Sequence, residues 1–189
     1  AAEFRNLPTS TKGRHHRRGR TRPAPGTKED GALIPPSIRA RLRYCEVAGE
    51  RLDLGRFPDF LIVGPQRTGP TWLHAILGSH PEVFLAEPKE IFFFSRLKER
   101  ASPRFESADL GWYLAHFRDP WPRWLARQVR TLARLHRPYC PKVRGEATAS
   151  YAAMDRARIE EIAVLGPATK ILMMVRHPVD RAWSHAKKD

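Results

Sequence analysis

The sequence predicts an α/β fold in which helices flank a central parallel sheet. From Phe57 onward, apolar runs of strand length alternate with segments of helical period, and this alternation is typical of parallel α/β units. The clearest run is Phe60–Val63, which is followed by Gly64. An uninterrupted apolar run of this length indicates a strand that is buried on both faces, as in the middle of a parallel sheet.

The other elements are predicted from periodicity and from helix-breaking residues. Apolar residues recur at helical spacing from Trp72 to Leu77, and Gly78 is placed to end that helix. A proline at Pro178 can begin a helix, because the first helical residue needs no amide hydrogen. The remaining predicted elements are a strand at Ile91–Phe94, a helix at Arg156–Leu165 before the break at Gly166 and Pro167, and a strand at Ile171–Val175.

A long amphipathic helix is predicted from Trp121 to Arg137, with Asp119 as its N-cap and Pro120 as its first helical residue. At 100° per residue, the apolar side chains fall on one face and the arginines on the opposite face. The apolar set is Trp121, Trp124, Leu125, Val129, Leu132 and Leu135, and the arginine set is Arg123, Arg127, Arg130, Arg134 and Arg137. Two interpretations remain open: a solvated arginine face above an apolar stripe packed on the core, or a surface for a polyanionic ligand.

Length and composition fit one globular domain. The chain has 189 residues, 41% of them hydrophobic, and a formal net charge of +14. Only two cysteines are present, Cys45 and Cys140, which excludes a disulfide-built mini-protein and a metal site of four thiolates. The sequence also predicts no membrane span, because it has no run of 18 apolar residues.

The basic surplus is concentrated at the N-terminus. Residues 1–28 hold eight lysines or arginines against the single acid Glu3, a net of +7. A segment this polar cannot bury enough apolar area to offset its chain entropy. We therefore expect residues 1–56 to form a basic flexible leader with a short helical lead-in, and residues 57–189 to form the folded domain. Such a leader leaves a basic polyanion-binding or nucleic-acid-binding protein as one functional alternative.

The most informative segment is the loop Gly64-Pro-Gln-Arg-Thr-Gly-Pro-Thr71 between the clearest strand and the next helix. Such a loop directs backbone amides and a helix N-terminus at one point, which creates an anion site. Its glycine spacing fits the nucleotide-triphosphatase pattern G-x-x-x-x-G-K-[ST], but Pro70 occupies the lysine position. The missing lysine, together with the lack of an evident acidic residue for Mg²⁺ after a strand, disfavours the alternative of a P-loop nucleotide kinase.

A second basic motif follows the last predicted strand, in the run Arg176-His-Pro-Val-Asp-Arg-Ala-Trp-Ser184. In open parallel sheets, ligands bind beyond the carboxyl ends of the strands, so Arg176 and the first loop are expected to share one rim. Arg176 offers a two-pronged contact to phosphate, and Ser184 adds a hydroxyl. Arg181 projects from another part of that helix and is expected to be structural.

The paired motifs resemble those of the sulfotransferase family that uses 3'-phosphoadenosine 5'-phosphosulfate (PAPS). The amino-acid sequence of the loop is most similar to that of the corresponding loop in heparan sulfate N-sulfotransferases and related bacterial enzymes. Two further segments match in the right order, Lys89-Glu-Ile-Phe-Phe-Phe94 and Gly145-Glu-Ala-Thr-Ala-Ser-Tyr151. The resemblance covers about Phe57 to Asp189. It implies a P-loop-containing fold, and a domain that is incomplete at its C-terminus, because the domains of that family continue beyond such a helix.

The resemblance also implies roles for individual residues. The donor would be PAPS, the acceptor a hydroxyl or amine of a glycan-like molecule, and neither a metal nor a specific nucleic acid would be required. Glu90 would be the general base, with Lys89 beside it, although an extended segment would point these two side chains to opposite faces. The implied cofactor-binding residues are Arg67 at the position of the family's catalytic lysine, Thr68, Gly69, Pro70 and Thr71 for the 5'-phosphate, Trp72 for the adenine, and Arg176 and Ser184 for the 3'-phosphate.

Overall fold

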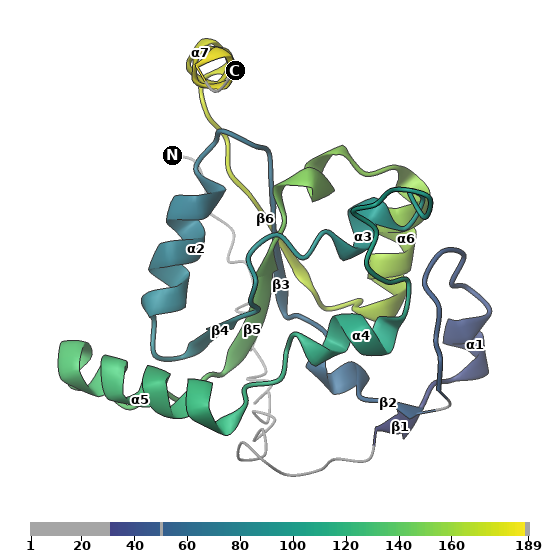
Figure 1. The fold of residues 1–189 in the computed structure, drawn as a ribbon, viewed down its shortest axis with the longest axis horizontal. Helices are drawn as coiled ribbons and strands as arrows, with labels where there is room; N and C mark the ends of the chain where they lie inside the picture. Colours follow the sequence, from purple (N-terminus) through teal and green to yellow (C-terminus); the bar gives the residue numbers. More distant parts are fainter. Residues whose placement is uncertain (1–30, 50, 188–189) are drawn as a thin grey trace, which may run out of the picture.

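The computed structural model describes residues 31–49 and 51–187, and the basic part of the predicted leader, residues 1–28, lies outside them. A four-stranded parallel sheet forms the centre, in the order β4-β5-β3-β6 (Figure 1). Its strands are β3 (Phe60–Gly64), β4 (Val83–Leu85), β5 (Val143–Ala147) and β6 (Lys170–Met173). The predicted α/β fold class is therefore confirmed.

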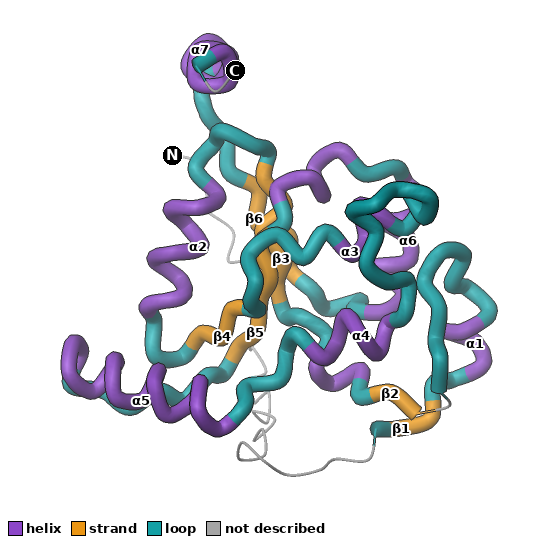
Figure 2. The backbone as a smooth tube through the Cα atoms, in the orientation of Figure 1, coloured by secondary structure: helices purple, strands orange, loops and turns teal. Residues whose placement is uncertain are grey.

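Strand β3 separates two apolar cores. Its side chains alternate between the faces of the sheet, as the geometry of a strand requires. Phe60 and Ile62 join the smaller core beneath the helix α2 (Pro70–Ser79), while Leu61 and Val63 join the larger core on the other side. Figure 2 shows α2 on one side of the sheet and the short helices on the other. All five residues of β3 are buried, which explains the uninterrupted apolar run in the sequence.

The larger core is covered by α3 (Phe93–Arg96), α4 (Leu110–Ala115) and α6 (Arg156–Leu165). Helix α6 matches its predicted bounds, and the Asp155 carboxylate caps it by accepting a hydrogen bond from the Arg158 amide. Helix α7 (Pro178–Ala186) begins at the predicted proline. Helix α2 continues through Gly78 and ends at Ser79.

The remaining described elements are β1 (Ala32–Leu33), α1 (Pro36–Arg39), β2 (Arg51–Leu52) and the 3₁₀ turns η1 (Leu54–Arg56) and η2 (Ala149–Ala153).

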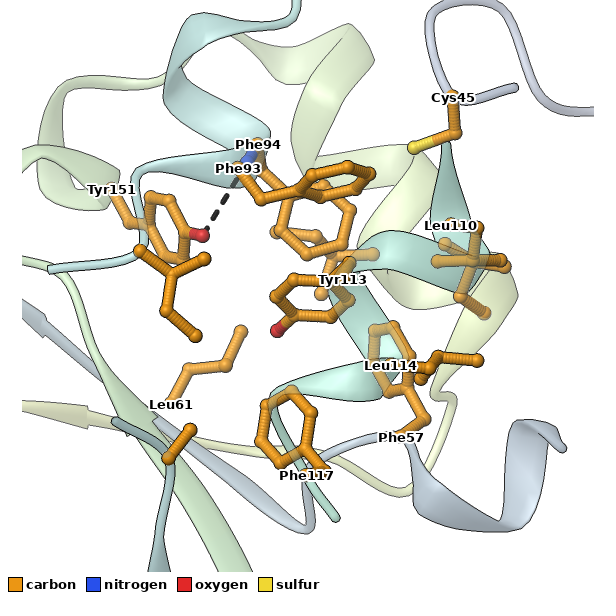
Figure 3. Close-up of a cluster of buried hydrophobic side chains, with 14 of the residues drawn as sticks. Cys45, Phe57, Leu61, Phe93, Phe94, Leu110, Tyr113, Leu114, Phe117 and Tyr151 are labelled. Atoms are coloured by element: carbon orange, nitrogen blue, oxygen red, sulfur yellow. Dashed lines mark hydrogen bonds between the residues drawn. The ribbon is translucent and has the colours of Figure 1, made fainter. Parts of the chain in front are cut away.

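The predicted strand at Ile91–Phe94 is wrong. Phe92 has a left-handed backbone (φ 60°) that starts α3 instead. The apolar run serves an aromatic cluster rather than a sheet: the Phe93 and Phe94 rings lie 4.7 and 5.1 Å from the Tyr113 ring (Figure 3). The sheet positions belong to β4 and β5, which the sequence did not reveal, because β4 has three residues and β5 contains Arg144 and Glu146.

The amphipathic helix α5 (Trp121–Leu135) packs through an unexpected face. Its apolar stripe is not packed on the core, which contradicts the first interpretation, since Trp121 is 63% and Val129 59% exposed. The inward side holds the buried Thr131 and the largely covered Arg127, whose guanidinium lies 4.7 Å from the centre of the Phe84 ring. The helix also starts after Pro120, one residue later than predicted, and the Asp119 carboxylate lies 3.7 Å from Arg127 Nη1.

Candidate functional site

A cavity of about 500 Å³ opens at the carboxyl ends of β3, β5 and β6. Four separate segments form its wall: the loop after β3, the turn around Glu90, the start of η2 at Ala149, and the segment from β6 into α7. The wall includes eight of the predicted residues, namely Arg67, Gly69, Pro70, Thr71, Lys89, Glu90, Arg176 and Ser184. The fold thus brings together predicted residues from three motifs that are distant in sequence.

The loop after β3 owes its shape to left-handed backbone at both ends. Gly64 has a φ of 93° and Gly69 a φ of 104°, a conformation that glycine adopts without steric cost. Gly69 is the N-cap of α2, so the first amides of that helix face the cavity and favour an anion there. Thr68 is buried, and its hydroxyl donates to the Pro65 carbonyl at 2.6 Å, inside the loop rather than at the cavity wall. The predicted phosphate contact of Thr68 stays a prediction.

The two basic motifs are joined by direct hydrogen bonds. Arg67 Nε donates to Ser184 Oγ at 3.1 Å, and Arg176 Nη1 donates to the Arg67 carbonyl at 3.2 Å. Arg181 Nε donates to the Gln66 carbonyl at 3.2 Å, which agrees with its expected structural role. The guanidinium groups of Arg67 and Arg176 therefore lie on one side of the cavity, where they suit a ligand with several negative charges.

Lys89 and Glu90 both reach the cavity, contrary to what an extended segment would allow. Glu90 has a left-handed φ of 67°, which breaks the alternation of side chains. Lys89 Nζ donates to Glu90 Oε1 at 2.9 Å, and the Ala149 amide donates to Glu90 Oε2 at 3.1 Å. A carboxylate that is held on both oxygens and faces a cavity can accept a proton from a bound ligand.

Trp72 is not part of the cavity wall. Its side chain projects from the first turn of α2 and is 63% exposed. The implied stacking on adenine stays a prediction.

Several residues near the site had no predicted role. Gln66, Phe92 and Ala149 complete the cavity wall, and their only sequence signal was that they lie inside the matching motifs. His74, one turn after Thr71, has a lowered pKa because it is partly buried and lies near Lys89. Glu146 is almost completely buried behind the cavity, and desolvation raises the pKa of its carboxyl.

The chemistry of the wall fits a polyanionic nucleotide. Arg67, Lys89 and Arg176 supply positive charge, and the N-terminus of α2 adds amide donors. Within residues 31–49 and 51–187, no group of three or more histidine, cysteine or acidic residues could hold a metal ion. In the same part of the chain, no helix is long and apolar enough to cross a bilayer.

Comparisons with known proteins agree with this geometry. A family model described as "Sulfotransferase family" matches residues 58–189. The chain is 29% identical over 147 residues to human bifunctional heparan sulfate N-deacetylase/N-sulfotransferase 2, covering 75% of the chain and 14% of that protein. It is 34% identical over 129 residues to human heparan sulfate glucosamine 3-O-sulfotransferase 6, covering 68% of the chain and 30% of that protein. The chain thus spans less than a third of the length of either relative.

Proposed function

The chain belongs to the sulfotransferase family, and we propose that it transfers the sulfuryl group of PAPS to a hydroxyl or amine of a glycan, with Glu90 as the general base. The observation that carries this proposal is the shared cavity, in which Arg67, Arg176 and the N-terminus of α2 lie beside the Glu90 carboxylate. The cations and the helix N-terminus suit a donor that carries phosphate at two ends, and the Glu90 carboxylate suits an acceptor that must lose a proton.

The cations divide between the two ends of the donor. Arg67 and the amides of Thr71 and Trp72 in the first turn of α2 would bind the 5'-phosphosulfate. Arg176 and Ser184 would bind the 3'-phosphate. Their hydrogen bonds to Arg67 hold the two phosphate-binding regions at a fixed distance from each other. PAPS supplies an activated sulfuryl group when it is bound. Arg67 would stabilise the charge that develops on the departing phosphate oxygen.

Glu90 would act on the acceptor. As the acceptor oxygen or nitrogen forms its bond to sulfur, the carboxylate takes the acceptor proton, and the sulfur–oxygen bond to the 5'-phosphate breaks, leaving 3'-phosphoadenosine 5'-phosphate (PAP). Lys89 Nζ donates a hydrogen bond to Glu90 Oε1 at 2.9 Å and so holds the carboxylate at the cavity wall. The names of the relatives support a glycan of the heparan sulfate type as acceptor.

The test separates donor binding from turnover. Glu90→Gln keeps the shape of the side chain but removes the base, so we expect kcat to fall by roughly 10²-fold to 10⁴-fold while PAP binding is unchanged. Radiolabelled sulfate transfer from PAPS to N-deacetylated heparosan measures the first quantity, and calorimetric titration with PAP measures the second. A parental kcat for Glu90→Gln would remove Glu90 from its role.

A ligand comparison tests the donor itself. Thermal stabilisation by PAP, but not by ATP with Mg²⁺, is the expected result, because Pro70 replaces the lysine of nucleotide kinases. Stabilisation by ATP with Mg²⁺ alone would favour the kinase alternative instead.

A further inference from the structure

A buried acid behind the cavity is connected to the segment that carries Glu90. Glu146 is 1% exposed and lies in β5. Its carboxylate accepts hydrogen bonds from three hydroxyls, those of Tyr113 at 2.5 Å, Thr148 at 2.7 Å and Tyr151 at 2.8 Å. Burying a carboxylate is costly even when it is well hydrogen-bonded, so a role other than stability is expected for it.

Two of these hydroxyls also contact the segment after Glu90. The Phe92 amide donates to Thr148 Oγ1 and the Phe94 amide to Tyr151 Oη, each at 3.4 Å. Figure 3 shows the second of these bonds. A hydroxyl that donates its only hydrogen to Glu146 can offer only lone pairs to other groups. The carboxylate therefore orients both hydroxyls as acceptors for the backbone of residues 92–94.

That backbone has a conformation that needs support from outside. Glu90 and Phe92 both have left-handed φ values, of 67° and 60°, which side chains other than glycine adopt only when their surroundings impose it. The end of β5 and the start of η2 supply two further contacts: the Glu90 amide donates to the Ala147 carbonyl at 2.9 Å, and the Ala149 amide donates to the Glu90 carboxylate at 3.1 Å.

We propose that Glu146 is a positioning residue for Glu90. Through the hydroxyls of Thr148 and Tyr151 it fixes the turn at residues 90–94, so that the Glu90 carboxylate faces the cavity. Glu146 is absent from the cavity wall and touches no reacting atom, so it acts only through its neighbours. This inference rests on the proposed function of Glu90 as the base.

The first experiment compares two buried carboxylates. Glu146→Gln should lower kcat for sulfate transfer to N-deacetylated heparosan by roughly tenfold to a hundredfold, the loss that a displaced catalytic group produces, while the Kd for PAP is unchanged. Glu161→Gln is the matched control. Glu161 is also 1% exposed and accepts from the Tyr44 and Cys45 amides at 2.6 and 3.3 Å, in a part of the core away from Glu90. The Glu161→Gln variant should retain the parental kcat.

A second pair of variants covers the case in which Glu146→Gln does not fold. Thr148→Val keeps the shape of the side chain but removes the hydroxyl between Glu146 and the Phe92 amide, and should lower kcat. Thr148→Ser keeps the hydroxyl and should retain the parental kcat. Equal kcat values for Thr148→Val and Thr148→Ser would overturn the proposal.

A double variant separates this inference from the function on which it rests. If Glu146 acts through Glu90, adding Glu146→Gln to Glu90→Gln should lower kcat no further. A parental kcat for Glu90→Gln would refute the base itself. A large loss for Glu90→Gln, with Glu146→Gln as active as Glu161→Gln, would refute only the positioning role. A crystal structure of Glu146→Gln in which Glu90 still accepts from the Ala149 amide would overturn it without any turnover measurement.

Discussion

Arg67 Nε donates a hydrogen bond to Ser184 Oγ at 3.1 Å and so joins two motifs that lie 117 residues apart in sequence. Arg67 belongs to the loop after β3, and Ser184 to the second turn of α7. The contact exists because β3 and β6 are parallel neighbours whose carboxyl ends meet at one edge of the sheet. It places the two phosphate-binding regions of the proposed donor site against each other.

Replacing Arg176 should weaken nucleotide binding. Arg176→Ala removes a charge-assisted contact worth about 2 kcal/mol, so the Kd for PAP should rise by roughly 30-fold, as measured by calorimetric titration. Arg130→Ala is the matched control, because it removes the same charge from the exposed face of α5. If both variants bind PAP equally well, Arg176 does not contact the 3'-phosphate.

Replacing Arg67 should affect turnover more than binding. Arg67→Ala removes the charge that faces the departing phosphate oxygen, and we expect kcat to fall by roughly 10²-fold to 10³-fold. Arg67→Lys keeps the charge and restores the residue type of the resembled family, so it should retain most of the parental kcat. Steady-state kinetics with varied PAPS distinguish the two effects. A change in KM alone, with kcat preserved in Arg67→Ala, would contradict a transition-state role.

Gly64 should tolerate no side chain. Its φ is 93°, and an added Cβ would lie 2.5 Å from the Ala149 carbonyl oxygen. The backbone strain alone costs about 1 to 3 kcal/mol, and the clash adds to it, so Gly64→Ala should lower the midpoint of urea unfolding sharply. Gly49→Ala is the control, because the nearest atom would lie 3.8 Å from its added Cβ. Similar midpoints for the two variants would show that the loop and the start of η2 are not tightly packed.

Asp155 should make stability depend on acid pH. Its hydrogen bonds to Lys98 and to the Arg158 amide lower the pKa of its carboxyl from 3.8 to about 2. A lowered pKa means that the folded state favours the charged form, so the stabilisation is complete above the ordinary value and is lost as the pH falls toward about 2.

The measurement is the thermal midpoint of the parental protein and of Asp155→Asn at several pH values. Asparagine keeps an oxygen that can cap α6 but cannot pair with Lys98. The difference between the two midpoints should therefore shrink from about pH 5 to about pH 2. Parallel curves over this range would show that the ionised Asp155 contributes nothing to stability.

Local signals identified much of this molecule from its sequence. The buried run of β3, the start of α7 at Pro178 and the bounds of α6 were readable because each depends on apolar content, proline geometry or capping within a few residues. The residues around Arg67 and Arg176 indicated anion sites for the same reason, since phosphate recognition needs glycine, basic and hydroxyl residues at short spacing. The sulfotransferase assignment came from the resemblance of these motifs to those of the family.

Only the tertiary structure decided which way several side chains point. The run Ile91–Phe94 has strand composition, yet it leaves the sheet because Phe93 stacks on Tyr113 of the distant helix α4 and Phe94 packs edge to face against the same ring. One of the two interpretations of α5 packed its apolar stripe on the core. Instead, Arg127 and Thr131 face inward and Trp121 faces outward, because the Arg127 guanidinium lies over the Phe84 ring and donates to Tyr139. Hydrophobic periodicity shows that a helix has two faces, and only its packing partners select the one that is buried.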